Sequence, residues 1–174
     1  IKRQLQKTQD ELLKKELPVL EKCREILDGE KPLRQAEFTK EEAHILKTYQ
    51  LLSVKPMLIA VNFDESQRGN AEELINGIAG SYTAKRAKVI SFFGKIELEM
   101  SELPDDEARV FMDEYGIKES ALNTLIREAY ALLGLQSFFT VGEDECRAWT
   151  IRKGMTAQEA AGVIHSDFVN KFIR

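Results

Sequence analysis

The sequence predicts an α/β fold in three parts: a helical arm, a βαβ unit and a closing β-β-α segment. Three observations support this prediction. Apolar residues recur at helical spacing early in the chain, two short apolar runs flank a helical segment in its middle, and a β-hairpin pattern precedes a helix near its end. We therefore expect domains at residues 1–38, 39–134 and 135–174.

The composition indicates a soluble globular protein. Of its 174 residues, 43% are hydrophobic, which suits one large or two small cores. The net charge of -4 disfavours nucleic-acid binding through overall charge, so any such contact needs a local basic face. No apolar run approaches the roughly 18 residues of a membrane span, and Cys23 and Cys146 match no metal or redox spacing. We expect a cytoplasmic protein with reduced thiols, no metal site and no membrane partner.

The first predicted element is a long amphipathic helix. Its apolar stripe recurs every seven residues, at Leu5, Leu12, Val19 and Ile26. Such a stripe has to pack on a partner helix, either in an ordinary bundle or as half of a long antiparallel coiled-coil arm. Pro18 should kink or restart the helix because proline removes a backbone donor, and Asp28-Gly29 should end it. The pattern has no N-cap residue before it, so we expect the chain to begin inside an element.

A βαβ unit is predicted for the next segment. Thr39 and Glu42 have capping-box spacing and should begin a helix that runs to about residue 52. Three further elements follow Pro56: a strand at 57–61, a helix at 71–82 and a strand at 87–93. The first apolar run fits a strand that is buried on both faces. Asn62 then stands at the carboxyl end of this strand.

The ends of the two strands carry the candidate site. In open parallel sheets, ligands bind at the carboxyl ends of the strands, where Asn62 to Glu65 and Gly94-Lys95 both fall. The pattern resembles the two base-reading loops of a P-loop GTPase-type domain, an N-K-x-D tetrad and a later S-A-K loop. Asparagine suits this role because its amide can donate to a purine N7 while it ties the two loops together. The plainer interpretation is that Asn and Asp are ordinary turn residues here.

The tetrad departs from the guanine-reading pattern at two positions. Phe63 replaces the lysine whose stem covers the base, and Glu65 replaces the aspartate that accepts two hydrogen bonds from guanine. A bidentate contact of this kind discriminates between bases by on the order of 1–3 kcal/mol, and an additional methylene group misplaces it. We therefore expect the preference for guanine to weaken or vanish.

The phosphate-binding part of a nucleotide site does not occur in this sequence. A P-loop needs Gly, four residues and then Gly-Lys-Ser/Thr, yet Gly94-Lys95 is followed by Ile96 and has Val89 where the first glycine should stand. A D-x-x-G match ends at Gly116, and we interpret this glycine as a helix C-cap.

The last third of the chain predicts two helices and a small β domain. The first helix is opened by Pro104 and should bury Ala108, Phe111, Met112 and Tyr115. The second is opened by Ser120 and should bury Leu122, Leu125, Ile126, Ala129 and Tyr130. Residues 137–140 and 146–151 form a predicted hairpin, and Thr156 with Glu159 caps another helix. We expect Trp149 in the core of this domain and His165 at a helix end. A β-grasp fold begins with the same β-β-α order.

The stretch RAWTIRKGMTAQEAAGVIHSDFVNKFIR, Arg147 to Arg174, resembles the TGS domain of the Obg-like ATPases of the YchF family. The resemblance extends back through LLGLQSFFT and KPMLIAVNFDE into the helical arm, so it covers essentially the whole chain. It implies the C-terminal half of such an ATPase: a helical coiled-coil arm, part of a P-loop GTPase-like domain and an incomplete β-grasp TGS domain. Gln158 stands where the family usually has proline, and Phe93-Gly94-Lys95 stands where an S/C-A-K-like loop is common.

The resemblance also implies a nucleotide site. The family's tetrad is N-x-x-E and is linked to ATP, with GTP as the alternative ligand and Mg²⁺ as a cofactor of the intact protein. The residues to which it assigns nucleotide binding are Asn62, Phe63 through its backbone, Glu65, Gly94 and Lys95. It places no catalytic residue and no metal ligand in this segment.

Three functions follow as expectations, in this order. The first is a ribosome-associated P-loop protein that binds and hydrolyses ATP; this chain supplies its base-reading residues, and is inactive alone because it has no phosphate-binding loop. The alternative is a ribosome- or RNA-binding adaptor without catalysis, and a purely structural coiled-coil protein comes third. The basic residues that either contact ribosomal RNA or form a solvated face are Lys85, Arg86, Lys88, Arg147, Arg152, Lys153, Lys171 and Arg174. An unpaired arm and open strand edges also predict self-association.

Overall fold

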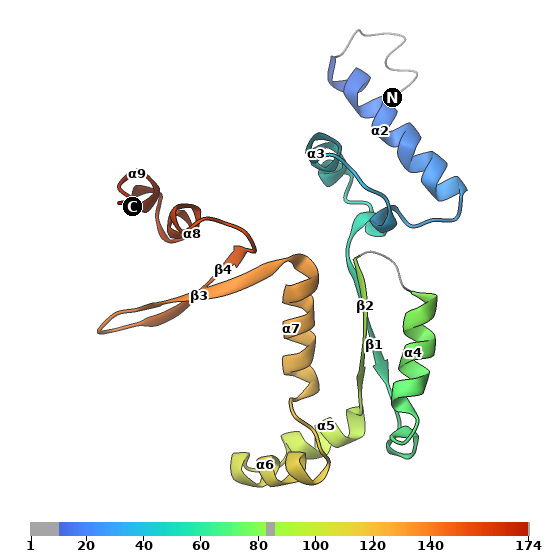
Figure 1. Cartoon of the computed structure of the whole chain (residues 1–174), viewed down its shortest axis with the longest axis vertical. Helices are drawn as coiled ribbons and strands as arrows, with labels where there is room; N and C mark the ends of the chain where they lie inside the picture. Colours follow the sequence, from blue (N-terminus) through green and yellow to red (C-terminus); the bar gives the residue numbers. More distant parts are fainter. Residues whose placement is uncertain (1–10, 83–85, 174) are drawn as a thin grey trace. The chain divides into compact units, whose positions relative to one another are not determined.

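The computed structural model describes residues 11–82 and 86–173 of a mixed α/β protein (Figure 1). The chain divides into two compact units, Ile1–Met57 with Ile78–Lys88 and Leu58–Gly77 with Val89–Arg174. Leu5, Lys85 and Arg174, together with the predicted start inside an element, lie outside the described residues. The predicted domain limits at residues 38 and 134 stay predictions.

The first unit is built on two helices and two 3₁₀ turns. Helix α2 spans Glu11–Asp28, α3 spans Lys40–Tyr49, and the turns are η1 (Leu33–Gln35) and η2 (Leu52–Val54). Its core is formed by four buried side chains of α2, η1 and α3, and Val54 of η2 packs against them. The four are Val19, Cys23, Leu33 and Leu46. Two polar contacts tie α2 to α3: Lys22 Nζ lies 2.9 Å from Glu42 Oε1, and the Tyr49 hydroxyl donates to Glu16 at 2.7 Å.

Helix α2 agrees with the sequence at its end and differs in its interior. It ends at Asp28 as predicted, but it continues through Pro18 without a restart. The predicted stripe is only partly used, since Val19 is buried whereas the Leu12 side chain is 67% exposed. The reason is that its described neighbours, α3 and η1, are short and pack on the second half of α2.

Helix α3 begins with the predicted capping box. Thr39 Oγ1 accepts from the Glu42 N–H, and Glu42 accepts from the Thr39 N–H. The helix ends at Tyr49, earlier than predicted, because Gln50 adopts a left-handed conformation with φ 49°.

The central segment forms the predicted βαβ unit. Strand β1 spans Met57–Asn62, α4 spans Ala71–Ser81 and β2 spans Ala87–Phe92. The Met57 N–H donates to Arg86 O and the Phe63 N–H to Phe92 O, and this constant offset makes the strands parallel. The prediction that β1 is buried on both faces is wrong: its residues are half-buried or exposed, because the described sheet consists of β1 and β2 alone.

Three helices follow β2 in the second unit. They are α5 (Gly94–Ser101), α6 (Asp105–Glu114) and α7 (Ala121–Leu133). Gly116 takes a left-handed conformation just after α6, as its predicted role in ending a helix requires, and Gly134 takes one just after α7. The predicted burial of Leu122, Leu125 and Ile126 is wrong, and Leu122 is 65% exposed. Among the described residues, α7 is contacted mainly near its ends, by α5 and by β3.

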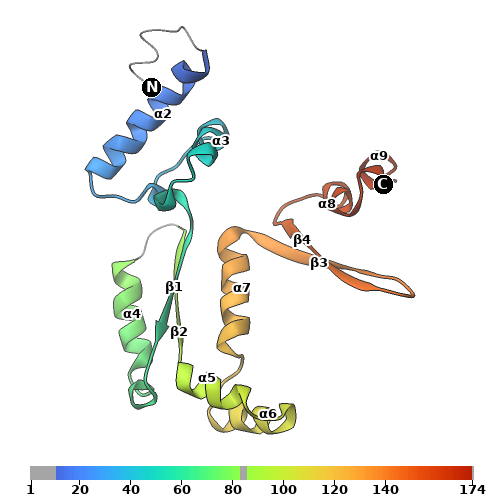
Figure 2. The same ribbon diagram turned by 180° about the vertical axis from the view of Figure 1, so that it is seen from behind.

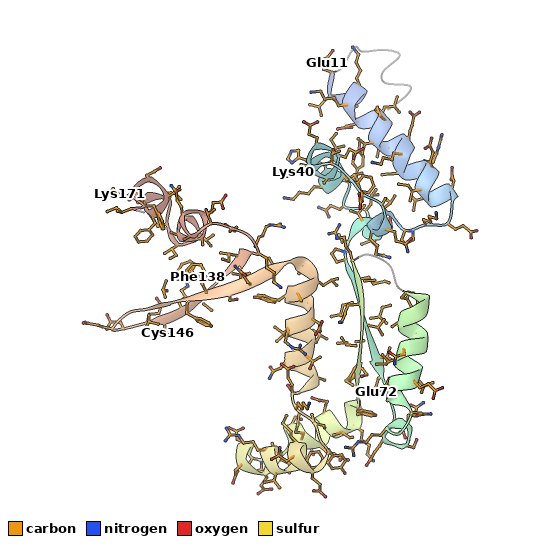
Figure 3. All side chains as sticks on the ribbon, in the orientation of Figure 1. Glu11, Lys40, Glu72, Phe138, Cys146 and Lys171 are labelled. Atoms are coloured by element: carbon orange, nitrogen blue, oxygen red, sulfur yellow. The ribbon has the colours of Figure 1, made fainter. Side chains whose placement is uncertain are left out.

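The chain closes with the predicted hairpin and two short helices. Strands β3 (Leu135–Val141) and β4 (Cys146–Arg152) pair antiparallel with Phe138 opposite Trp149, and Phe138 and Cys146 are labelled in Figure 3. Helix α8 (Ala157–Ile164) begins with the predicted Thr156 capping box, and the His165 side chain caps α9 (Ser166–Asn170). Trp149 is half-buried, and its Nε1 donates to Thr140 Oγ1 at 2.9 Å. No helix of residues 11–82 and 86–173 has the length and apolar character needed to cross a membrane.

Candidate functional site at the carboxyl ends of β1 and β2

The centre of the candidate site is a hydrogen bond between the ends of the two strands. Asn62 is the last residue of β1, and Gly94 is the first residue of α5, just beyond β2. The Gly94 N–H donates to Asn62 Oδ1 at 2.9 Å. The structure therefore brings together two of the residues that the sequence selected from segments 32 positions apart.

Gly94 allows this contact because it carries no side chain. A Cβ at this position would lie 3.0 Å from Asn62 Oδ1 and 3.4 Å from Nδ2, tighter than an ordinary contact. Asn62 is exposed, and its amide NH₂ group has no hydrogen-bond partner among the described residues. Since Oδ1 is occupied by Gly94, the NH₂ group is the part of the amide that a ligand can use.

Phe63 is part of the packing beneath the site. Its side chain is 6% exposed, and its ring centroid lies 6.3 Å from that of Phe93 at an interplanar angle of 44°. The Phe63 N–H is also used, because it donates to Phe92 O. The side chain thus cannot cover a base as the lysine of N-K-x-D does.

Asp64 has a local structural role. Its carboxylate accepts from the N–H and the hydroxyl of Ser66 at 3.0 and 2.6 Å, and caps the 3₁₀ turn η3 (Glu65–Gln67). These hydrogen bonds hold the pKa of Asp64 below its usual value, and the charge of Lys95 adds to the effect. The plain turn interpretation therefore describes Asp64. Glu65 differs, since its exposed carboxylate accepts no hydrogen bond from the described residues.

Gly94 and Lys95 begin a helix. Phe93, in an extended conformation, is the N-cap of α5, so the expected second loop is replaced by the first turn of this helix. Lys95 is 70% exposed, and its Nζ lies 3.9 Å from Glu99 Oε1. Lys95 stands next to the Asn62–Gly94 contact in the chain and remains accessible.

Two hollows flank Phe93. One, of about 460 Å³, lies toward α4 and includes Arg68 and Ile75; the other, of about 300 Å³, lies toward α7 and includes Ile96 and Arg127. Phe93 contributes to both walls. The sequence marks Phe93 only as a departure from the family triplet. Its place directly after a strand is the signal that could have predicted its role in lining these hollows.

Two further contacts had no sequence signal because their partners are far apart in the chain. The Arg68 guanidinium lies 5.1 Å from the Tyr115 ring centroid and donates to Tyr115 O. Glu97 Oε1 accepts from the Ala121 N–H at 2.8 Å. Among the described residues, no three His, Cys, Asp or Glu side chains gather as metal ligands would.

Comparison with known proteins places this arrangement in a family. Residues 135–174 match the family model YchF-GTPase_C, described as a protein of unknown function (DUF933). A Ribosome-binding ATPase YchF of Bacillus subtilis (strain 168) is 44% identical over 161 residues, which are 91% of this chain and 44% of the relative. Obg-like ATPase 1 of Rattus norvegicus is 38% identical over 171 residues, with coverage of 94% and 42%. The chain belongs to the YchF family.

A solved YchF structure has the same mixed α/β fold. The Schizosaccharomyces pombe YchF GTPase superposes with a TM-score of 0.74 at 30% identity, over 92% of this chain and 43% of that chain. The chain thus spans less than half the length of the YchF relatives that it matches.

Proposed function

We propose that this chain supplies the base-reading part of a ribosome-associated P-loop ATPase of the YchF type. The names of its relatives support the class of activity, since they are called a ribosome-binding ATPase, an Obg-like ATPase and a YchF GTPase. In this proposal residues 1–38 are the second half of a coiled-coil arm, residues 39–134 belong to the nucleotide-binding domain, and residues 135–174 begin a TGS domain in a cytoplasmic protein. The start of the family match at residue 135 supports the last limit.

The observation that carries the proposal is the hydrogen bond from Gly94 to Asn62. It turns the amide so that its NH₂ group can donate to the N7 atom of a purine. Glu65 then accepts from the exocyclic amino group of the base. Because its side chain is one methylene longer than aspartate, it fits the paired donors of guanine poorly, and adenine becomes the preferred base.

The chain's residues act on the base and leave the phosphates to other parts of the intact protein. Asn62 and Glu65 orient the base, the buried Phe63 fixes the backbone beside it, and Gly94-Lys95 closes the opposite edge. When bound, Mg²⁺ would neutralise phosphate charge, but residues 11–82 and 86–173 gather no three side chains that would serve as its ligands. Phosphoryl transfer depends on positioned phosphates and a metal, so the chain alone is expected to bind ATP without hydrolysing it.

Titration of the chain with ATP and GTP tests the proposal. Base contacts alone should give a dissociation constant on the order of 1 mM for ATP. Asn62→Ala should abolish binding, and Glu65→Asp should shift the preference toward GTP. Asn123→Ala is the matched control, because it removes an exposed asparagine of α7 and should leave ATP binding unchanged. Equal ATP binding by the wild type and Asn62→Ala would refute the assignment, and turnover by the purified chain would refute its inactivity.

A second candidate, an RNA- or ribosome-binding adaptor, is favoured by the charged surface of the hairpin. The Arg147 guanidinium lies 4.4 Å from the centroid of the Trp149 ring, and Arg152 and Lys153 are exposed at the hairpin base. Binding to ribosomes that weakens steeply with salt and is lost in Arg152→Ala, which removes a charge at the hairpin base, would support this function. The acidic turn of Glu143, Asp144 and Glu145 limits RNA contact to the hairpin base.

Self-association is the remaining proposal about partners. The apolar face of α7 and the exposed Phe139 and Val141 of the hairpin provide uncovered apolar area. Light scattering should show species larger than a monomer, and a monodisperse monomer would contradict the proposal.

A further inference from the structure

Helix α7 is hydrogen-bonded to other elements at both of its ends. At its first residue, the Ala121 N–H donates to Glu97 of α5. At its far end, the Tyr130 hydroxyl lies 3.1 Å from Thr150 Oγ1 of β4, and the Lys153 N–H donates to Gly134 O at 2.8 Å. Figures 1 and 2 show α7 running from the α5–α6 end of this unit to the start of β3.

Glu97 connects this helix to the candidate site. It lies in the same short helix as Gly94, one turn further along, and its N–H donates to Phe93 O at 2.9 Å. Its side chain is half-buried, and one carboxylate oxygen accepts from the amide at the N-terminus of α7. The Ser120 hydroxyl already caps α7 by accepting from the Asn123 N–H. The contact from Glu97 is therefore a link between helices in addition to the helix's own cap.

We propose that Glu97 is a positioning residue: by holding the first residue of α7, it fixes α5 so that the Gly94 N–H meets Asn62. Helix α5 has only eight residues and a single strand connection, so its own hydrogen bonds fix its direction weakly. The bond to α7 adds a directional constraint to the packing of Ile96, which is 2% exposed. Through the contacts at the other end of α7, the same link connects the Asn62–Gly94 bond with the hairpin. The relevance of this link to nucleotides rests on the proposed function, whereas the link itself does not.

The experiment measures amide hydrogen exchange of Gly94 by NMR in the nucleotide-free chain. Glu97→Ala removes the acceptor, and Ala121→Pro removes the donor. Proline is well suited to this first helical position, and the preceding Ser120 already has the extended conformation, φ -62° and ψ 154°, that a following proline requires. Each variant should speed the exchange of Gly94 about fivefold, the effect of losing one hydrogen bond.

Two comparisons separate positioning from general loosening. Ser120→Ala removes the helix's own cap and should speed exchange at Asn123 while leaving Gly94 unchanged. The double variant Glu97→Ala/Ala121→Pro should be no worse than either single variant, because both remove the same bond. The proposal is overturned if Gly94 is unaffected in both single variants, or if Ser120→Ala affects it equally. If Glu97→Ala does not fold, the exchange rate of Gly94 in Ala121→Pro decides between the two outcomes.

A titration with ATP then distinguishes the two proposals. If the wild-type chain binds ATP, each single variant should bind ATP about fivefold more weakly. Failure of the wild type to bind ATP would refute the proposed function, and the exchange of Gly94 would still decide whether Glu97 positions it.

Discussion

Replacing Gly94 with alanine tests whether the Asn62–Gly94 contact orients the asparagine. The added methyl group would lie 3.0 Å from Asn62 Oδ1 and 3.5 Å from its Cγ, so the amide has to retreat by a few tenths of an ångström. The helix gains up to about 1 kcal/mol from alanine, and the strained hydrogen bond loses about 1 kcal/mol. The two terms nearly cancel, so we expect a free energy of unfolding close to that of the wild type.

The same displacement should weaken binding of the base. Loss of an oriented amide corresponds to about a five- to tenfold lower affinity for ATP. Urea unfolding and ATP titration of the same sample would separate the two effects. Gly77→Ala is the matched control, because a methyl group there meets nothing within 4 Å: it should raise stability by about 0.5–1 kcal/mol and leave ATP binding unchanged. Unchanged ATP affinity in Gly94→Ala would refute the reasoning.

Three other predictions follow from packing and charge. Leu33→Ala should lower the free energy of unfolding of the first unit by about 2–5 kcal/mol in urea denaturation, because Leu33 is 0% exposed. Gly162→Ala should destabilise the α8–α9 pair by about 1–3 kcal/mol, since its methyl group would clash with Val169 Cγ2; adding Val169→Ala should restore stability. Hydrogen bonds from the Thr39 backbone and Lys22 lower the pKa of Glu42 in the folded protein. Its contribution to the free energy of unfolding is therefore present above about pH 4.3, the pKa of an unfolded glutamate, and is lost as the pH falls through the lower pKa of the folded state. Glu42→Gln should flatten the acid side of a stability–pH curve.

Elements that depend on neighbouring residues could be predicted from the sequence. The capping boxes of Thr39 and Thr156 and the left-handed Gly134 lie where the local pattern places them, because each is decided within a few residues. The position of Asn62 at the end of β1 follows in the same way. Pro18 is an exception, since the packing of Val19 and Cys23 keeps the helix continuous despite the lost donor.

Apart from the contact of Asn62 with Gly94, contacts between distant segments could not be predicted from the sequence. Helical spacing identified the apolar side of α7 but could not show that Leu122 and Ile126 remain exposed, because burial depends on which element lies against that side. The bond from Ala121 to Glu97 and the ring contact of Phe63 with Phe93 depend on how the chain returns in space. Nucleotide binding by Asn62, Phe63, Glu65, Gly94 and Lys95 stays a prediction until a ligand is measured.

The uninterrupted course of α2 through Pro18 has a consequence for the order of assembly. Proline cannot donate to the carbonyl of Lys14, so the first turns of α2 are cut off from the cooperative hydrogen bonding of the second half. One described tie of these turns to the rest of the unit is the bond from Tyr49 to Glu16. The second half of α2 can therefore fold with Leu33 and Leu46 first, and docking of α3 then helps to order the turns before Pro18.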